Sequence, residues 1–141
     1  MVQMNPYLNF DGTAEAAFTF YKSVFGGEFA AVHRMNGAPG SEGLPEDEQN
    51  RVMHIALPIG EHFTLMGSDT LPSMGHQLHA GNNVHLSLHP HSREEADRLF
   101  NGLSEGGVIE MPLMDTFWGA YFGNFKDKFG VNWMVNYNPN M

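Results

Sequence analysis

The chain has 141 residues, lacks cysteine and carries a formal net charge of −9. Its length favours one domain, and the lack of cysteine excludes disulfides, thiolate metal sites and cysteine nucleophiles. An acidic surface without a basic stripe repels a phosphate backbone, so we expect no nucleic-acid partner. The apolar runs are too short to span a membrane, and the N-terminus lacks the regions of a secretion signal. We therefore predict a cytoplasmic protein that does not contact membranes.

The first half of the sequence predicts a strand, a helix and three more strands. Residues 6–10 alternate as a strand does, and apolar residues then recur at spacings of three and four from Ala14 to Phe25, which is typical of one helix face. Asp11 or Thr13 can cap the start of this helix, and two glycines can end it. Strand-like segments follow at Glu28–Met35, Arg51–Pro58 and His62–Met66.

Two segments rich in glycine and proline interrupt the regular elements. Asn36–Asn50 is predicted to be a long loop, and such loops in compact domains tend to be lids or disordered. Ser68–Asn83 joins the halves, and its His76 and His79 lack a helix that would hold them as zinc ligands. Asp69 in this segment can bind a ligand or cap the following turn, and we favour the cap.

The second half repeats the order of the first. Val84–Leu88 alternates strictly, Ser92 and Glu95 form a capping box, and a helix face runs from Ala96 to Leu103 before a second pair of glycines. Strand-like segments follow at Val108–Leu113, Ala120–Asn124 and Val131–Tyr137, with a hairpin turn at Asp127–Gly130. Matched strands, caps and helix ends indicate a duplicated module.

The sequence therefore predicts a single α+β domain made of two βαβββ halves, at about residues 1–70 and 80–141. Each helix must bury its apolar side chains against one face of a sheet, because each such side chain stabilises the fold by about 1.5–3 kcal/mol when buried. The other face of each sheet is then free to line a cavity, which we call the cup. We expect the protein to act inside this cup.

Several motifs carry a resemblance to a known family: Asn5–Phe10, Phe20–Gly27, Met53 with His54, Ser68 with Asp69, Thr116–Gly119 and Asp127–Met134. They resemble the PhnB-like proteins of the vicinal oxygen chelate superfamily, which includes glyoxalase I, bleomycin-resistance proteins and extradiol dioxygenases. The resemblance covers nearly the whole chain. It implies paired βαβββ modules that form an open barrel-like sheet, and it implies a homodimer.

The resemblance also implies where a metal would bind. Metal-dependent relatives hold their ion with four His, Gln or Glu ligands from strands that face the cup. The corresponding positions here fall at or near Asn5, Leu65 with Met66, Asn83 and Met134. Asparagine is a weak neutral ligand and methionine prefers soft metals. We therefore expect no metal and no other cofactor, which argues against glyoxalase-type and dioxygenase-type chemistry.

Histidines on two strands are candidates for the site. His54 is the candidate catalytic residue, because imidazole titrates near neutral pH. It can act as a ligand or proton-transfer group, or it can be a hydrogen-bonded residue of the cavity wall, and both interpretations stay open. His85 shares a strand face with Asn83 and Ser87, and for it we favour the wall.

Aromatic residues are the second group of candidates. Tyr7 lies on the cup face of the first strand, Phe117 and Trp118 fall in a loop beside the cup mouth, and Tyr121 follows them. Cavities lined by aromatic groups with a few polar anchors are typical of small-molecule sites. The predicted ligand-binding residues are Tyr7, His54, His85, Phe117, Trp118 and Tyr121.

Three functions remain open from the sequence. The first is a module that binds a small, partly apolar molecule in the cup without the usual metal. The second is an enzyme of the superfamily that uses unorthodox ligands, such as His54 with His85, or metal-free acid–base chemistry. The third is an interaction protein, to which the ten methionines would supply adaptable apolar surface. Of these three functions we favour the binding module. Whether the chain is also an enzyme stays open.

Overall fold

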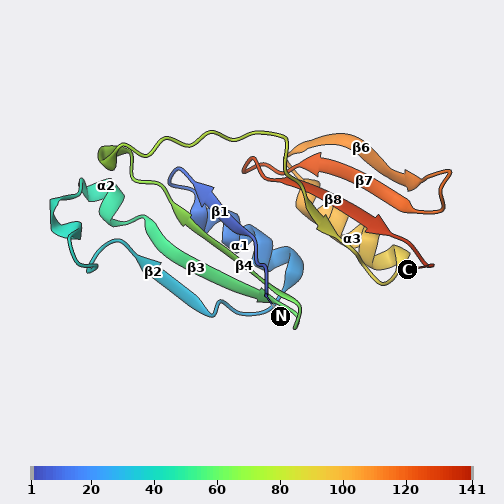
Figure 1. The fold of residues 1–141 in the computed structure, drawn as a ribbon, viewed down its shortest axis with the longest axis horizontal. Coiled ribbons are helices and arrows are strands. Elements are labelled where there is room, and N and C mark those ends of the chain that lie inside the picture. The colour runs from blue at the N-terminus through green and yellow to red at the C-terminus, as the bar shows by residue number, and fades with distance from the viewer. Residues whose placement is uncertain (1, 141) are drawn as a thin grey trace. The chain divides into compact units, whose positions relative to one another are not determined.

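The computed structural model describes residues 2–140. It contains two four-stranded sheets with the same strand order and connections (Figure 1). One sheet lies in the unit Met1–His79 and the other in the unit Ala80–Met141, which we call the N-terminal and C-terminal units. Each unit combines its sheet with one long helix. The prediction of an α+β fold with paired βαβββ modules is confirmed, and each sheet is open rather than closed into a barrel.

The N-terminal unit has the sheet order β1-β4-β3-β2. β1 pairs with β4 in parallel, and the remaining neighbours are antiparallel. The elements are β1 (Tyr7–Phe10), α1 (Ala14–Phe25), β2 (Ala31–Arg34), β3 (Val52–Ile59) and β4 (Phe63–Asp69), with a short helix α2 (Glu46–Gln49) and single turns at Ser41–Gly43 and Pro72–Met74.

The C-terminal unit has the equivalent order β5-β8-β7-β6, again with a parallel pair, β5 and β8, beside antiparallel ones. Its elements are β5 (Leu86–Leu88), α3 (Arg93–Ser104), β6 (Val108–Asp115), β7 (Tyr121–Lys126) and β8 (Asn132–Tyr137). Ser92 caps α3 as predicted, since its Oγ accepts a hydrogen bond from the Glu95 N–H at 3.1 Å.

The core of the N-terminal unit lies between α1 and one sheet face. Phe18 and Tyr21 from the helix are fully buried, as are Ile55 and Leu65 from the sheet. Gly67 sits directly beneath the helix, because a Cβ at this position would lie 2.8 Å from Cε1 of Phe18. A side chain here would push α1 away from the sheet.

The C-terminal unit buries its aromatic residues in the same way. Phe125 and Trp133 are fully buried, and the ring of Phe100 from α3 meets that of Phe125 edge-on at 5.0 Å. The Trp133 indole N–H donates to Oδ2 of Asp127 at 2.8 Å. Asp127 therefore ties the hairpin turn between β7 and β8 to the core.

Two predictions about the N-terminal unit need correction. The side chains of Asp11 and Thr13 do not cap α1; the Ala14 N–H at its start donates instead to Oδ1 of Asp69 at 2.9 Å. The segment 36–50 is not a structureless loop, since it contains α2 and is fixed by its Asn36 N–H, which donates to the Gln49 carbonyl. Among the described residues, no helix is long and apolar enough to cross a membrane.

Candidate functional site

Helix α1 covers one face of the N-terminal sheet, and both predicted ligand-binding residues of this unit, Tyr7 and His54, lie on the other face. Paired residues of neighbouring strands point to the same face. Tyr7 pairs with Met66, and Met66 pairs with Ala56, so these three share a face. His54, two residues from Ala56, lies on it as well. Leu8 and Phe10 alternate with Tyr7 and turn toward α1, where Phe10 is buried.

Tyr7 and His54 form a contact on this open face. Their ring centroids are 5.8 Å apart with an angle of 24° between the planes, and Tyr7 Oη lies 3.3 Å from His54 Nδ1. This hydrogen bond fixes the orientation of the imidazole and leaves its Nε2 edge available. Tyr7 is 47% exposed, so the two near-parallel rings present an accessible aromatic surface.

Polar side chains surround the ring pair. His33 on β2 is the direct partner of His54 on β3, which brings two imidazoles to one face. Ser68 pairs with Asn9, and their side chains lie 3.4 Å apart. The open face of the N-terminal unit thus combines aromatic rings with neutral or titratable hydrogen-bonding groups.

The open face of the C-terminal unit has a different composition. Met134 on β8 pairs with Ser87 on one side and Asn124 on the other, and Asn136 pairs with Phe122. The amide oxygen Oδ1 of Asn136 is buried and has no hydrogen-bond partner among the described residues.

His85 lies immediately before β5 in this unit. Its Nε2 is 3.8 Å from a carboxylate oxygen of Glu110 on β6, at the limit of an ion pair. The neighbouring Ser87 hydroxyl lies 3.1 Å from Nε2 of His89. His85 therefore has an acidic neighbour in its own unit, a feature that the strand pattern alone did not predict.

The turn between β6 and β7 exposes two aromatic residues. Phe117 is 98% exposed and Trp118 is 56% exposed, with their rings edge-on at 5.0 Å. The Trp118 ring also lies 6.4 Å from that of Phe122, which belongs to the open face. Their position in a loop beside this face agrees with the sequence analysis, whereas contact with a ligand stays a prediction.

Tyr121 lies on the opposite, helix-covered face from Phe122. Its hydroxyl donates to Oδ1 of Asp97 on α3 at 2.6 Å, and the Arg93 guanidinium lies over its ring at 3.9 Å. The hydrogen bond to Asp97, together with burial, raises the pKa of Tyr121. The structure therefore does not bring Tyr121 together with Trp118 and Phe122, and its contacts are those of a clamp that holds α3 to the sheet.

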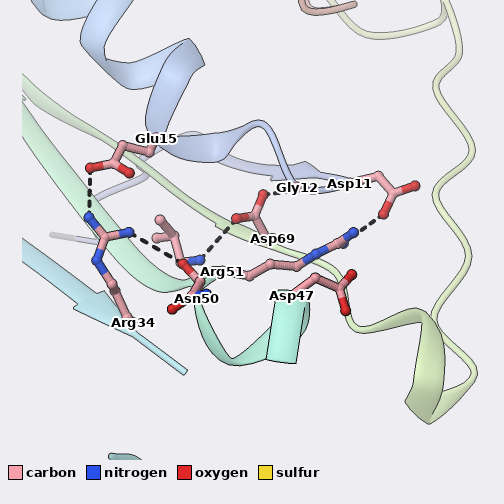
Figure 2. Close-up of a pocket in the computed structure, with 9 residues that line it drawn as sticks. Asp11, Gly12, Glu15, Arg34, Asp47, Asn50, Arg51 and Asp69 are labelled. Atoms are coloured by element: carbon pink, nitrogen blue, oxygen red, sulfur yellow. Dashed lines mark hydrogen bonds and ion pairs between the residues drawn. The ribbon is translucent and has the colours of Figure 1, made fainter. Parts of the chain in front are cut away.

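A polar cavity in the N-terminal unit was not predicted. It has a volume of about 390 Å³ and lies beside the start of α1, where side chains from four separate segments meet (Figure 2). We call it the α1 pocket; its lining residues are Asp11, Gly12, Glu15, Arg34, Asp47, Asn50, Arg51, Val52 and Asp69. The signal in the sequence was that charged residues follow β1, precede β3 and end β4, which places them at neighbouring strand ends.

Two ion pairs cross the α1 pocket. Arg51 donates to Asp11 at 2.7 Å, and Arg34 donates to Glu15 at the same distance. The guanidinium hydrogen bonds hold the pKa values of both carboxyl groups below their usual range. Asp69 is buried behind them. The prediction that it caps the following turn is wrong, because its carboxylate accepts the N–H groups of Gly12, Ala14 and Val52 instead.

Duplicated βαβββ units, each with one free sheet face, define the class to which the chain belongs. The model of the glyoxalase/bleomycin resistance protein/dioxygenase superfamily matches residues 3–135, and the chain is a member of this superfamily. Protein YjdN of Escherichia coli strain K12 is 33% identical to this chain in an alignment that covers 94% of this chain and 93% of YjdN.

Two solved structures are similar over almost their full length. Protein PA1353 from Pseudomonas aeruginosa superposes with a TM-score of 0.85 at 40% identity, covering 98% of each chain. A PhnB protein from Bacillus cereus superposes with a TM-score of 0.77 at 26% identity, covering 96% of this chain and 99% of its own. The resemblance to PhnB-like proteins is confirmed.

The side chains at the positions that the resemblance assigns to metal ligands are poorly suited to a hard divalent ion. The amide oxygen of Asn5 already accepts the Thr64 N–H at 2.9 Å. Asn83 is a neutral amide, and Met66 and Met134 offer only thioether sulfur, which suits soft metals. Within residues 2–140, no group of three or more His, Asp or Glu side chains is arranged to hold a metal. These donors supply neither charge nor imidazole.

Proposed function

We propose that the protein binds a small, partly apolar molecule on the open faces of its sheets, without the divalent metal of its metal-dependent relatives. The observation that carries this proposal is the Tyr7–His54 ring pair, which gives a planar ligand an aromatic surface with a hydrogen-bonding edge. The formal charge of −9 favours a cationic ligand over an anionic one.

Ligand screening with matched variants tests this proposal. Protein without a histidine tag is screened by thermal shift against planar aromatic amines, planar aromatic acids and aliphatic compounds of similar size. We expect hits among the aromatic amines, and we expect Tyr7→Ala and His54→Ala to weaken binding of those hits at least tenfold. His62→Ala, which changes an exposed histidine in the turn before β4, serves as the control. Equal affinity of all three variants would rule out the ring pair as the binding surface.

Metal analysis tests the second part of the proposal. Elemental analysis of the same tag-free protein should give no stoichiometric zinc, manganese, iron or nickel. A bound metal that disappears in His54→Ala would instead favour an enzyme with unorthodox ligands.

Acid–base catalysis is the alternative, and the hydrogen bond between Tyr7 and His54 favours it. A tyrosine hydroxyl that holds one imidazole nitrogen leaves the other free to take a proton from a bound molecule. Mass spectrometry of each hit after incubation tests this alternative. Chemical conversion by the wild type that is lost in His54→Asn, while binding persists, would identify catalysis; unchanged hits would leave binding alone.

We also propose that the protein is a homodimer. β6 exposes Val108, Ile109, Met111 and Met114, and β2 and β6 are unpaired sheet edges within their units. Exposed apolar strands with free edges favour association with another chain. Light scattering coupled to size exclusion should give twice the 15.7 kDa mass of one chain. The cytoplasmic location remains a prediction from the sequence.

A further inference from the structure

The α1 pocket is separate from the open sheet face and contains charged groups with unused hydrogen-bonding capacity. None of Tyr7, His54, Asn9 or Ser68 lines it. Its volume of about 390 Å³ lies at the small end of the range of small-molecule sites, about 300–1,000 Å³. Any ligand must therefore be small and must satisfy charges of both signs.

Arg51 is the donor side of the pocket. Its side chain is only 17% exposed, and it packs against Gly12, where a Cβ would lie 3.2 Å from Nη2. Nη1 donates to Asp11 and to the Thr70 carbonyl, and no partner is found for Nε or Nη2 within residues 2–140. A fixed guanidinium with a free edge is suited to a carboxylate, whose two oxygens match the planar fork.

Carboxylates dominate the remaining wall. Four acidic residues and two arginines line the pocket, so an anion alone would face a surplus of negative charge. Asp11 and Glu15 are paired with the arginines, and Asp69 already accepts three backbone N–H groups. Asp47 on α2 has no hydrogen bond or ion pair in the described part of the chain. It is close enough to Arg51 to act on that guanidinium through its charge, and both residues belong to the lining of the pocket drawn in Figure 2.

We propose that the α1 pocket binds a small zwitterion with one carboxylate and one ammonium group, of the class of free α-amino acids. The carboxylate lies against the free edge of Arg51, and the ammonium group lies against Asp47. A ligand of this kind uses both the free edge of Arg51 and the unpaired carboxylate of Asp47, whereas an anion alone leaves Asp47 unpaired and a cation alone leaves the edge of Arg51 unused. The proposal is independent of the one made for the open face.

Nuclear magnetic resonance titration of the full-length protein tests this proposal. The probes are glycine, L-alanine, L-lysine and L-glutamate, with acetate as the anion alone and methylammonium as the cation alone. The signals to follow are the backbone amides of Gly12 and Asn50 and the Nε–H of Arg51. We expect saturable shifts of these signals with at least one amino acid, and none with acetate or methylammonium at the same concentration.

Matched variants separate the pocket from a general charge effect. Asp47→Asn should weaken amino-acid binding at least tenfold, and Arg51→Lys should do the same because an ammonium lacks the planar fork. Glu46→Gln removes the same charge from the same short helix but from a residue outside the lining, and it should bind as the wild type does. The proposal fails if no amino acid gives saturable shifts, if acetate alone reproduces them, or if Asp47→Asn binds as tightly as Glu46→Gln.

Discussion

Asp69 should be the polar side chain on which the N-terminal unit depends most. It is 6% exposed and lies at the end of β4. Its Oδ1 accepts the N–H groups of Gly12 at 3.0 Å and Ala14 at 2.9 Å, and its Oδ2 accepts that of Val52 at 2.9 Å. One carboxylate thus joins the turn after β1, the start of α1 and the start of β3.

The size of the effect follows from these bonds. Asp69→Ala leaves the buried N–H groups of Ala14 and Val52 without acceptors, while that of Gly12 is partly accessible to water. Each buried orphan donor costs about 1–3 kcal/mol, so we expect a loss of about 2–6 kcal/mol in the free energy of unfolding. Asp69→Asn keeps one acceptor oxygen and should lose about 1–3 kcal/mol. The whole free energy of unfolding of a small domain is only about 5–15 kcal/mol.

The assay must report on the correct unit. Both tryptophans, Trp118 and Trp133, lie in the C-terminal unit, so their fluorescence does not follow the region around Asp69 directly. Urea unfolding followed by circular dichroism, with hydrogen exchange of the Leu57 amide in β3, reports on the N-terminal unit. Asp47→Asn is the control, because an exposed side chain without partners should change stability by less than about 0.5 kcal/mol. A loss below about 1 kcal/mol for Asp69→Ala would refute the assignment of Asp69 as the residue that joins these segments.

Three further predictions concern packing, capping and titration. Gly67→Ala should destabilise the protein by about 1–3 kcal/mol in urea unfolding, because its Cβ would meet Phe18 at 2.8 Å, whereas Gly43→Ala, with open space around it, should not. Ser92→Ala should cost about 0.5–2 kcal/mol through loss of the α3 cap, and a change below this range would show that the cap contributes little. The pKa of Tyr121, followed by ultraviolet absorbance, should lie above the ordinary value of 10.0, because its hydroxyl donates to Asp97. This hydrogen bond therefore stabilises the fold below pH 10 and is lost as the pH rises further. Asp97→Asn should lower this pKa, and an unchanged titration would contradict the hydrogen bond as the cause.

The repeated part of the fold was predictable because it depends on local patterns. Helix periodicity identified α1 and α3, and the box of Ser92 and Glu95 identified the start of α3. These signals need only residues a few positions apart, so a single sequence carries them.

Contacts between distant segments were not predictable in the same way. Thr13 has the local signature of a helix cap, but the acceptor for the first helical N–H comes from Asp69, 55 positions after Ala14. Tyr121 is a related case. Because it follows Phe117 and Trp118 in the sequence, we predicted that its side chain lines the cup. The register of β7 instead directs it to α3, where Asp97 and Arg93 hold it. Register is set by pairing partners, and a shift of one residue moves a side chain to the other face.

The use of Asp69 also limits what the start of α1 can bind. A free helix N-terminus attracts anions, because its N–H groups and the helix dipole both favour negative charge. Here the N–H groups of Gly12 and Ala14 are already taken by a carboxylate of the chain itself. An incoming carboxylate must therefore rely on the free edge of Arg51, next to a carboxylate-rich wall, and this is why the α1 pocket favours a ligand that carries its own positive charge.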